Sequence, residues 1–239
     1  MNSYALVSGA SRGIGRSIAE VLAQNGYSLI LTCHNSFENL KDFAKTLEKQ
    51  YNITCIPKQC DMKNAEEVCL LFKEIPTLDV VINNAGISYV GLLQDMTPEE
   101  WDEVINTNLS SAFYTSKYAI PLMLQKHAGH IINISSVWGA AGAAAEVAYS
   151  ASKGGLNTFT KALAKELAPS GIQVNALSCG LIDTQMNSHL SEEDIKALQE
   201  EIPAGRQGRC EEVAQAVWNL LQMPSYFTGQ IVTLDGGWI

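Results

Sequence analysis

Two side chains capable of acid–base chemistry lie close together in the stretch VAYSASKGG (147–155). Tyr149 and Lys153 are four positions apart, so on a helix they lie on the same side. A lysine ammonium favours the phenolate form of a neighbouring tyrosine and helps the phenol exchange a proton near neutral pH. The same spacing also occurs on solvated helix surfaces, where the pair has no catalytic role. The rest of the chain must decide between these interpretations.

A glycine-rich segment near the N-terminus could bind phosphate. Gly9, Gly13 and Gly15 stand in SGASRGIG (8–15), between an expected strand and an expected helix. Glycines permit a tight turn, and a helix N-terminus offers N–H groups to a pyrophosphate. A turn that merely needs glycine would show the same residues, but the position between strand and helix favours a nucleotide site.

The end of the second expected strand favours a cofactor with a 2′-phosphate. Folds that bind NAD place a carboxylate there for the ribose 2′-hydroxyl, about 20 residues past the glycines. This chain has Cys33 at that point and no acid nearby. Arg12 could instead form a charge-assisted contact with a 2′-phosphate, and His34 and Asn35 could add donors. We therefore expect NADP(H) rather than NAD(H).

Short apolar runs alternate with helical patterns along the whole chain. Such alternation indicates a parallel sheet with helices on both faces, whose ligands bind beyond the carboxyl ends of the strands. No repeat or linker divides the chain, so we expect a single domain over 1–239. The expected strands are 4–9, 28–33, 53–59, 79–84, 130–136, 172–178 and 230–235, and the expected helices are 15–26, 36–50, 64–75, 99–125, 149–167 and 210–222.

Composition and charge exclude several classes of protein. The 239 residues are 46% hydrophobic and 17% charged, which is typical of a globular chain. A net charge of −9 argues against a nucleic-acid partner, and no apolar run is long enough to cross a membrane. The N-terminal residues lack the pattern of a signal peptide, so we expect a cytoplasmic protein.

The cysteines and histidines form no pattern typical of a metal site. Without a secretory signal, the scattered cysteines are expected to be reduced thiols. We therefore expect no catalytic metal. The residues concerned are Cys33, Cys55, Cys60, Cys69, Cys179, Cys210, His34, His127, His130 and His189.

Further motifs stand at the ends of later strands. NNAG (83–86) ends the fourth strand, NISS (133–136) ends the fifth, and YSASK (149–153) follows 13 residues after Ser136. With SGASRGIG and the terminal LDGGW (234–238), they resemble the short-chain dehydrogenase/reductase family over the whole chain, especially its 3-oxoacyl-carrier-protein reductase group. The resemblance implies a Rossmann-type doubly wound fold with a seven-stranded, mainly parallel sheet. It also implies a homotetramer and NADP-dependent reduction of a ketone.

The resemblance assigns a role to each of four candidate catalytic residues. Tyr149 would protonate the carbonyl oxygen, and Lys153 would tune the phenol and hold the nicotinamide ribose. Ser136 would polarise the carbonyl, and the absence of GxSxG around it argues against a hydrolase nucleophile. Asn108 would hold a water in a proton relay; alternatively, it is a buried asparagine satisfied by the backbone.

The same resemblance implies a set of residues that line the cofactor. Asp61 would lie beside the adenine, although an exposed strand-end aspartate would look the same, and Ile182 and Thr184 would contact the carboxamide. The full set is Gly9, Ser11, Arg12, Gly13, Ile14, Gly15, His34, Asn35, Asp61, Met62, Asn83, Ala85, Gly86, Tyr149, Lys153, Ile182 and Thr184.

The chain departs from the family pattern in two places. Cys179 precedes Gly180 where proline is usual, which frees φ and restores an N–H at that turn. This thiol could be oxidised near the nicotinamide, or it could simply fill space. His127 and Ser170 stand where carrier-protein reductases often have arginines, and an acidic enzyme without those arginines attracts an acidic carrier less well.

One carboxylate near the tyrosine motif points to another substrate. Glu146 stands where glutamine is common and could pair with a cationic substrate group; alternatively, it is a surface glutamate. The chain also resembles a group that reduces an aminopentanone modification on a lysine of elongation factor P. Segment 183–208 is expected to be a lid over the substrate. A protein of a different class, a non-catalytic NADP-binding sensor, would need the glycine loop but not the proton donor.

Overall fold

Seven parallel strands form one sheet in the order β3-β2-β1-β4-β5-β6-β7. The computed structural model describes residues 3–188 and 190–239, so His189 of the predicted lid lies outside the described residues. The strands are β1 (Tyr4–Val7), β2 (Ser28–Cys33), β3 (Cys55–Gln59), β4 (Val80–Asn83), β5 (Gly129–Ser136), β6 (Ile172–Cys179) and β7 (Ile231–Leu234).

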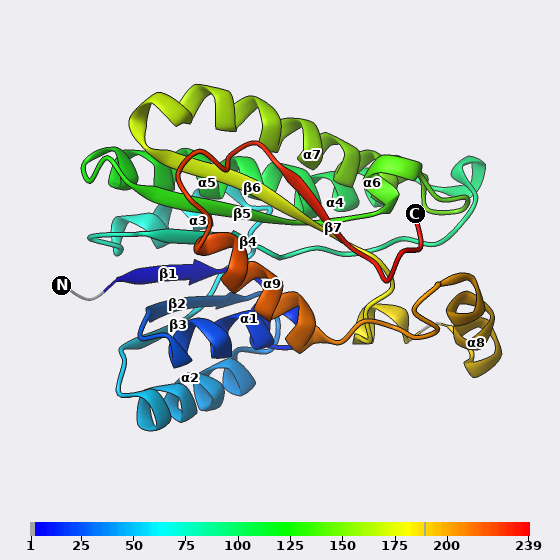
Figure 1. Ribbon diagram of the computed structural model, residues 1–239, viewed down its shortest axis with the longest axis horizontal. Coiled ribbons are helices and arrows are strands. Elements are labelled where there is room, and N and C mark those ends of the chain that lie inside the picture. Colours follow the sequence, from blue (N-terminus) through cyan, green and yellow to red (C-terminus); the bar gives the residue numbers. More distant parts are fainter. Residues whose placement is uncertain (1–2, 189) are drawn as a thin grey trace.

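Helices connect the strands and cover both faces of the sheet (Figure 1). The α-helices are α1 (Gly13–Gln24), α2 (Phe37–Tyr51), α3 (Ala65–Lys73), α4 (Pro98–Ile105), α5 (Ser111–Leu124), α6 (Trp138–Ala141), α7 (Val147–Leu167), α8 (Glu192–Glu201) and α9 (Cys210–Leu221). The remaining helical turns are η1 (Leu93–Asp95), η2 (Asn106–Ser110), η3 (Ala168–Ser170) and η4 (Gln185–Asn187).

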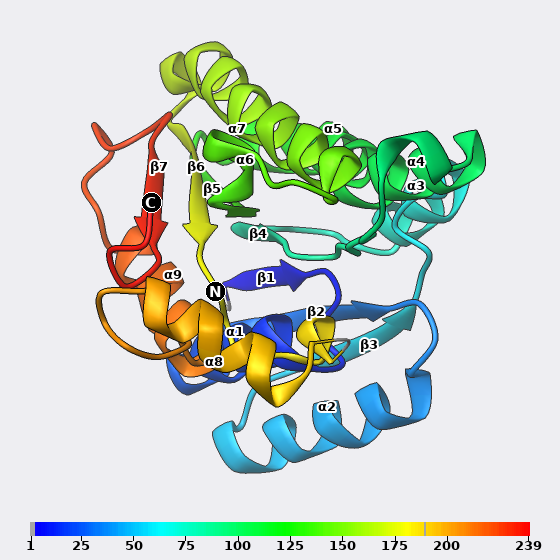
Figure 2. The ribbon, with the colours of Figure 1, turned by 90° about the vertical axis from the view of Figure 1, so that its right-hand side faces the viewer.

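Two hydrophobic cores hold the layers together. On one face, α1, α2 and α9 pack against the sheet; on the other face α3, α5 and α7 do so (Figure 2). Every residue of β2, β4 and β6 is buried, which explains why their sequences are nearly continuous apolar runs. The predicted doubly wound fold with a seven-stranded sheet is confirmed.

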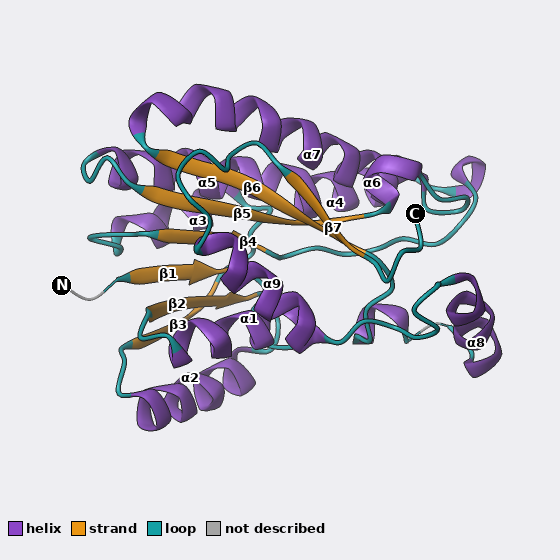
Figure 3. Ribbon diagram, viewed as in Figure 1, coloured by secondary structure: helices purple, strands orange, loops and turns teal. Residues whose placement is uncertain are grey.

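The strand order changes direction beside β1. The chain builds β1, β2 and β3 outward, then returns to place β4 on the other side of β1. Ligands of such sheets bind beyond the carboxyl ends of the strands at this switch point. The strands point toward the side of the molecule on which α6 and α8 lie (Figure 3). No helix within the described ranges is long and apolar enough to cross a bilayer.

The long helix predicted over 99–125 is present from Pro98 to Leu124, and one of its turns is π-helical. A capping box between Thr97 and Glu100 starts α4 at Pro98, and α5 ends at Leu124. Between them lies a π-helical turn, η2, which carries Asn108. Turns of this kind insert extra backbone into a helix and are frequent at functional sites. Hydrophobic periodicity does not distinguish them from a continuous α-helix.

Candidate active site

Helix α7 brings Tyr149 and Lys153 together. The Lys153 Nζ lies 5.6 Å from the centroid of the Tyr149 ring, as the four-residue spacing predicts. Lys153 is only 5% exposed, and its ammonium donates a hydrogen bond of 2.9 Å to the Ile134 carbonyl of β5. Because the ammonium is anchored inside the protein, this pair is not a solvated helix edge.

Strand β5 carries Ser136 to the same place. Ser136 is the last residue of the strand and is 6% exposed. Its hydroxyl accepts a hydrogen bond of 3.2 Å from the Trp138 N–H and also hydrogen-bonds the Tyr149 phenol. The hydroxyls of Ser136 and Tyr149 can therefore converge on one carbonyl oxygen.

Burial sets the protonation of both groups on α7. Burial raises the pKa of Tyr149, the Ser136 hydrogen bond opposes that rise, and the charge of Glu146 adds to it. Burial also lowers the pKa of Lys153 to about 8. At neutral pH the phenol therefore holds its proton and the lysine is mostly cationic, which is the arrangement that a proton donor needs.

Asn108 fastens the loop after β4 to α7. It is 2% exposed, and its side chain exchanges two hydrogen bonds with the backbone of Ile87, of 2.8 Å and 2.9 Å. Its amide also donates to Ser152 Oγ over 3.0 Å, and Ser152 in turn donates to the Tyr149 carbonyl over 2.7 Å. The Asn108 side chain thus connects the loop after β4 to α7. Its predicted role in a water relay stays a prediction.

The backbone conformation and close packing of the glycine loop require glycine. Gly9 and Gly13 have φ of +65° and +54°, which L-residues rarely adopt. A Cβ on Gly15 would lie 2.4 Å from the Gly9 carbonyl oxygen. Helix α1 has no side-chain cap and no acidic residue in its first turn, so its first N–H groups suit an anion. The loop therefore fits a pyrophosphate, with Ser11 and Ile14 on either side of the helix start.

Ser8 and Asn84 lock this loop to β4, and the sequence analysis did not single them out. Ser8 Oγ accepts hydrogen bonds of 3.0 Å from the N–H groups of Asn84 and Ala85. Asn84 Nδ2 donates to the carbonyls of Ser8 and Gly9, at 2.9 Å and 3.2 Å. Both residues stand inside predicted motifs, but their bonds span more than 70 positions, so local sequence gave no sign of them.

The other residues of NNAG take different places. Asn83 is buried, and its amide donates a hydrogen bond of 2.8 Å to Asn133 Oδ1 of β5. Its side chain therefore links β4 to β5. A Cβ on Gly86 would lie 3.2 Å from Asn108 Oδ1 and 3.5 Å from Lys153 Nζ. Gly86 therefore lies directly beside the two predicted catalytic side chains.

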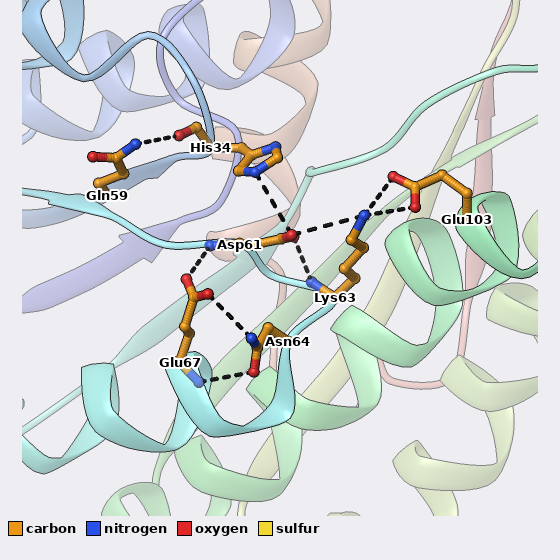
Figure 4. Close-up of polar contacts among 7 residues, drawn as sticks. All are labelled: His34, Gln59, Asp61, Lys63, Asn64, Glu67 and Glu103. Carbon is orange, nitrogen blue, oxygen red and sulfur yellow. Dashed lines mark hydrogen bonds and ion pairs between the residues drawn. The ribbon is translucent and has the colours of Figure 1, made fainter.

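The loops after β2 and β3 form a polar cluster (Figure 4). His34 Nε2 lies 3.7 Å from Asp61 Oδ2, and Lys63 Nζ lies 3.8 Å from the same oxygen. Lys63 also pairs with Glu103 of α4 at 2.6 Å. Asn35 follows His34, and Met62 is buried against Thr32. The predicted adenine and ribose residues thus come together at the carboxyl ends of β2 and β3.

The start of the predicted lid meets the glycine loop. Arg12 Nη1 donates a hydrogen bond of 2.9 Å to Gln185 Oε1 of η4. The Thr184 methyl carbon would lie 3.7 Å from a Cβ on Gly13, and Ile182 pairs with Gly208 in an isolated bridge. The segment after β6 therefore reaches the glycine loop, and the contact of Ile182 and Thr184 with the carboxamide stays a prediction.

The unusual Cys179 is a packed thiol. It is 5% exposed, and burial raises its pKa to about 12, although the nearby Lys153 charge opposes the rise. A thiol that stays protonated is a poor nucleophile, which favours the space-filling interpretation. Gly180 is required there, because a Cβ would lie 2.7 Å from Asp235.

His127 and Ser170 lie at the opposite end of the sheet. They precede the first residues of β5 and β6, whereas Ser136 ends β5. A Cβ on Gly171 would lie 2.5 Å from the His127 carbonyl oxygen, so the two segments touch. Neither position faces the Tyr149 site of the same chain.

Comparison with known proteins identifies the family. Residues 3–195 match the family model described as short chain dehydrogenase. The 3-oxoacyl-[acyl-carrier-protein] reductase FabG of Aquifex aeolicus is 40% identical over 237 residues, covering 97% of this chain and 95% of the relative. The uncharacterized oxidoreductase YmfI of Bacillus subtilis is 37% identical over 240 residues, covering 100% of this chain and 99% of the relative.

A solved structure agrees with this result. YwfH, described as an NADPH dependent reductase involved in bacilysin biosynthesis, superposes with a TM-score of 0.92 at 27% identity, covering 100% of this chain and 99% of YwfH. The chain therefore belongs to the short-chain dehydrogenase/reductase family, whose members are oxidoreductases that use a nicotinamide cofactor.

Proposed function

We propose that this chain is an NADPH-dependent reductase that converts a ketone to a secondary alcohol. The observation that carries the proposal is the half-buried Tyr149 side chain, whose phenol keeps its proton between the Ser136 hydroxyl and the Lys153 ammonium. A non-catalytic NADP-binding sensor would have no use for this arrangement.

Ser136, Tyr149 and Lys153 have different roles in the reduction. Ser136 and Tyr149 donate hydrogen bonds to the substrate carbonyl oxygen, and so orient and polarise the carbonyl. A bound nicotinamide cofactor would supply the hydride that the carbonyl carbon accepts. Tyr149 gives its proton to the carbonyl oxygen, which completes the alcohol and leaves a phenolate beside Lys153. The ammonium stabilises that phenolate, and solvent returns the proton.

Arg12 and the residues after β2 favour NADPH over NADH. Arg12 is exposed at the start of α1, and Cys33 at the end of β2 is followed by His34 and Asn35, not by a carboxylate. YwfH, with a similar fold, is described as NADPH dependent. The other candidate groups, Asp61 and Met62, would hold the adenine.

Replacing Arg12 with Ala is expected to raise the KM for NADPH about tenfold or more and to leave the KM for NADH nearly unchanged. The reason is that a charge-assisted contact with the 2′-phosphate exists only with NADPH. Steady-state rates with each cofactor measure the effect. Arg16→Ala is the matched control, since Arg16 stacks on Phe43. Equal changes with both cofactors would remove Arg12 as the 2′-phosphate partner.

For the substrate, we propose first a 3-oxoacyl thioester. Support comes from relatives that are 3-oxoacyl-[acyl-carrier-protein] reductases at 40% identity. The test is NADPH oxidation by the purified protein with an acetoacetyl thioester, beside a peptide that carries an aminopentanone group. Fast turnover of the thioester alone would support this assignment.

A specific contact favours a second substrate, the 5-aminopentanone modification on elongation factor P. Ser88 Oγ donates a hydrogen bond of 2.8 Å to Glu146 Oε2, which holds a carboxylate at the start of the helix that carries Tyr149. A protonated amine on the ketone could pair with that carboxylate.

Replacing Glu146 with Gln is expected to raise the KM of an amino-ketone about tenfold, because the substrate loses one charge-assisted contact. The KM of a neutral ketone is expected to stay the same. Parallel titrations of both ketones measure the difference, with Glu99→Gln on α4 as the control. An unchanged KM for the amino-ketone would leave Glu146 without a role in binding.

A further inference from the structure

The Glu146 carboxylate has no cationic partner within the described parts of the chain. Glu146 is half-buried, and none of the ion pairs among the described residues includes it. Ser88 Oγ donates to one of its oxygens. An unpaired carboxylate interacts strongly with any other charge that enters its surroundings.

The surrounding loops fix this carboxylate in place. The Asn108 side chain hydrogen-bonds both the N–H and the carbonyl of Ile87, the residue before Ser88. The Gly91 N–H donates 2.8 Å to the carbonyl of Ala145, the residue before Glu146. The residues that precede Ser88 and Glu146 are therefore both fixed by hydrogen bonds.

The fixed carboxylate acts on the proton donor. Glu146 stands at the N-cap position of α7, three residues before Tyr149, and makes no side-chain capping hydrogen bond; its charge raises the pKa of the phenol. The Lys153 ammonium is a charge of the opposite sign near the phenol, with Nζ 5.6 Å from the ring centroid. Cys179 also faces the phenol, but burial raises its pKa to about 12, so it carries no charge near neutral pH. Burial is the largest influence on the acidity of Tyr149, and the charge of Glu146 adds to its effect.

We propose that Glu146, positioned by Ser88, makes proton donation by Tyr149 respond to the charge of the substrate. A cationic group that pairs with the carboxylate cancels the charge that opposes phenolate formation. Ketones that carry an ammonium group would then have a higher kcat as well as a lower KM. Ser88 and Glu146 are positioning residues for the proton donor. This inference rests on the proposed reduction of ketones by Tyr149.

The chemical step itself stays the same. Hydride adds to the carbonyl carbon, and the O–H bond of Tyr149 breaks as its proton passes to the carbonyl oxygen. The products are the alcohol, oxidised cofactor and a phenolate. The added cation lowers the free energy of that phenolate by neutralising Glu146, in the way that any opposite charge favours an ionised group.

The test uses a substrate without charge and supplies the cation separately. The oxidation of a neutral secondary alcohol by NADP⁺ is followed against pH, with and without n-butylammonium, and with 1-butanol as the uncharged control. In Glu146→Gln, the apparent pKa of the profile is expected to fall by at least about 0.5 unit. In the wild type, n-butylammonium is expected to cause a shift in the same direction, and in Glu146→Gln it should cause none.

Two further variants separate this effect from a loss of structure. Ser88→Ala keeps the carboxylate but frees it, so its profile should lie between those of the wild type and Glu146→Gln. Glu99→Gln removes an exposed carboxylate of α4 and should match the wild type. Identical profiles for the wild type and Glu146→Gln, or an equal amine effect in both, would overturn the inference. If the wild type turned over neither ketone nor alcohol, the proposed function itself would fail instead.

Discussion

Replacing Tyr149 with Phe is expected to lower kcat for ketone reduction by about 10³-fold or more while NADPH still binds. The substitution removes only the hydroxyl from a ring held between α7 and β5, so the packing persists while the proton donor is lost. NADPH oxidation with a saturating ketone measures the rate, and titration of NADPH fluorescence measures the Kd. The two readouts separate chemistry from binding.

A matched control is available elsewhere in the chain. Tyr226 is 98% exposed, so Tyr226→Phe should leave both rate and Kd unchanged. If Tyr149→Phe kept its turnover, Tyr149 would not be the proton donor. If neither the wild type nor the variant reduced any ketone while both bound NADPH, the chain would be a cofactor-binding sensor.

The fold could be predicted because its signals are local. Strands buried on both faces read as apolar runs, as SLILTC does in β2, and helices with one buried face show a 3.6-residue period. The short helix α6 and the π-helical turn η2 were missed because neither has a hydrophobic period of its own. Asn108 was a candidate from the motif, but its three hydrogen bonds reach Ile87 and Ser152, which no local pattern links to it.

The candidate site could be predicted in its residues but not in its electrostatics. Spacing placed Tyr149 and Lys153 on one side of a helix, yet it did not reveal that burial shifts their pKa values in opposite directions. Such shifts depend on how much protein surrounds a group in three dimensions. The Ser88–Glu146 contact, between residues 58 positions apart, was invisible for the same reason.

Replacement of the buried Lys153 is expected to have the second large effect, a loss of activity together with a gain in stability. Replacing Lys153 with Met is expected to abolish ketone reduction, because the phenolate loses its stabilising charge and the ribose loses its expected partner. The same change is expected to raise the stability of the cofactor-free protein at pH 7. A pKa lowered from 10.5 to about 8 corresponds to about 3 kcal/mol of unfavourable free energy for the charged form in the folded state.

Part of that gain is offset. The Lys153 ammonium donates to the Ile134 carbonyl, and methionine leaves this buried acceptor without a donor, which costs about 1 kcal/mol. The expected net gain is about 2 kcal/mol, or roughly 5 °C in Tm for a chain of this size. Thermal unfolding of the wild type and the variant without cofactor measures it, with the exposed Lys161→Met on the same helix as the control.

The stability difference between the wild type and Lys153→Met is expected to depend on pH. The folded-state pKa of Lys153 lies below that of the unfolded chain, so below pH 8 both states are protonated and the folded protein bears the full unfavourable term. Between about pH 8 and 10.5 the folded state has released the proton and the unfolded state still holds it, so wild-type stability rises with pH. The advantage of Lys153→Met should therefore be largest below pH 8 and shrink toward pH 10. A variant that is less stable than the wild type at pH 7, or an advantage that does not shrink, would mean that the ammonium is well solvated or paired in the folded protein.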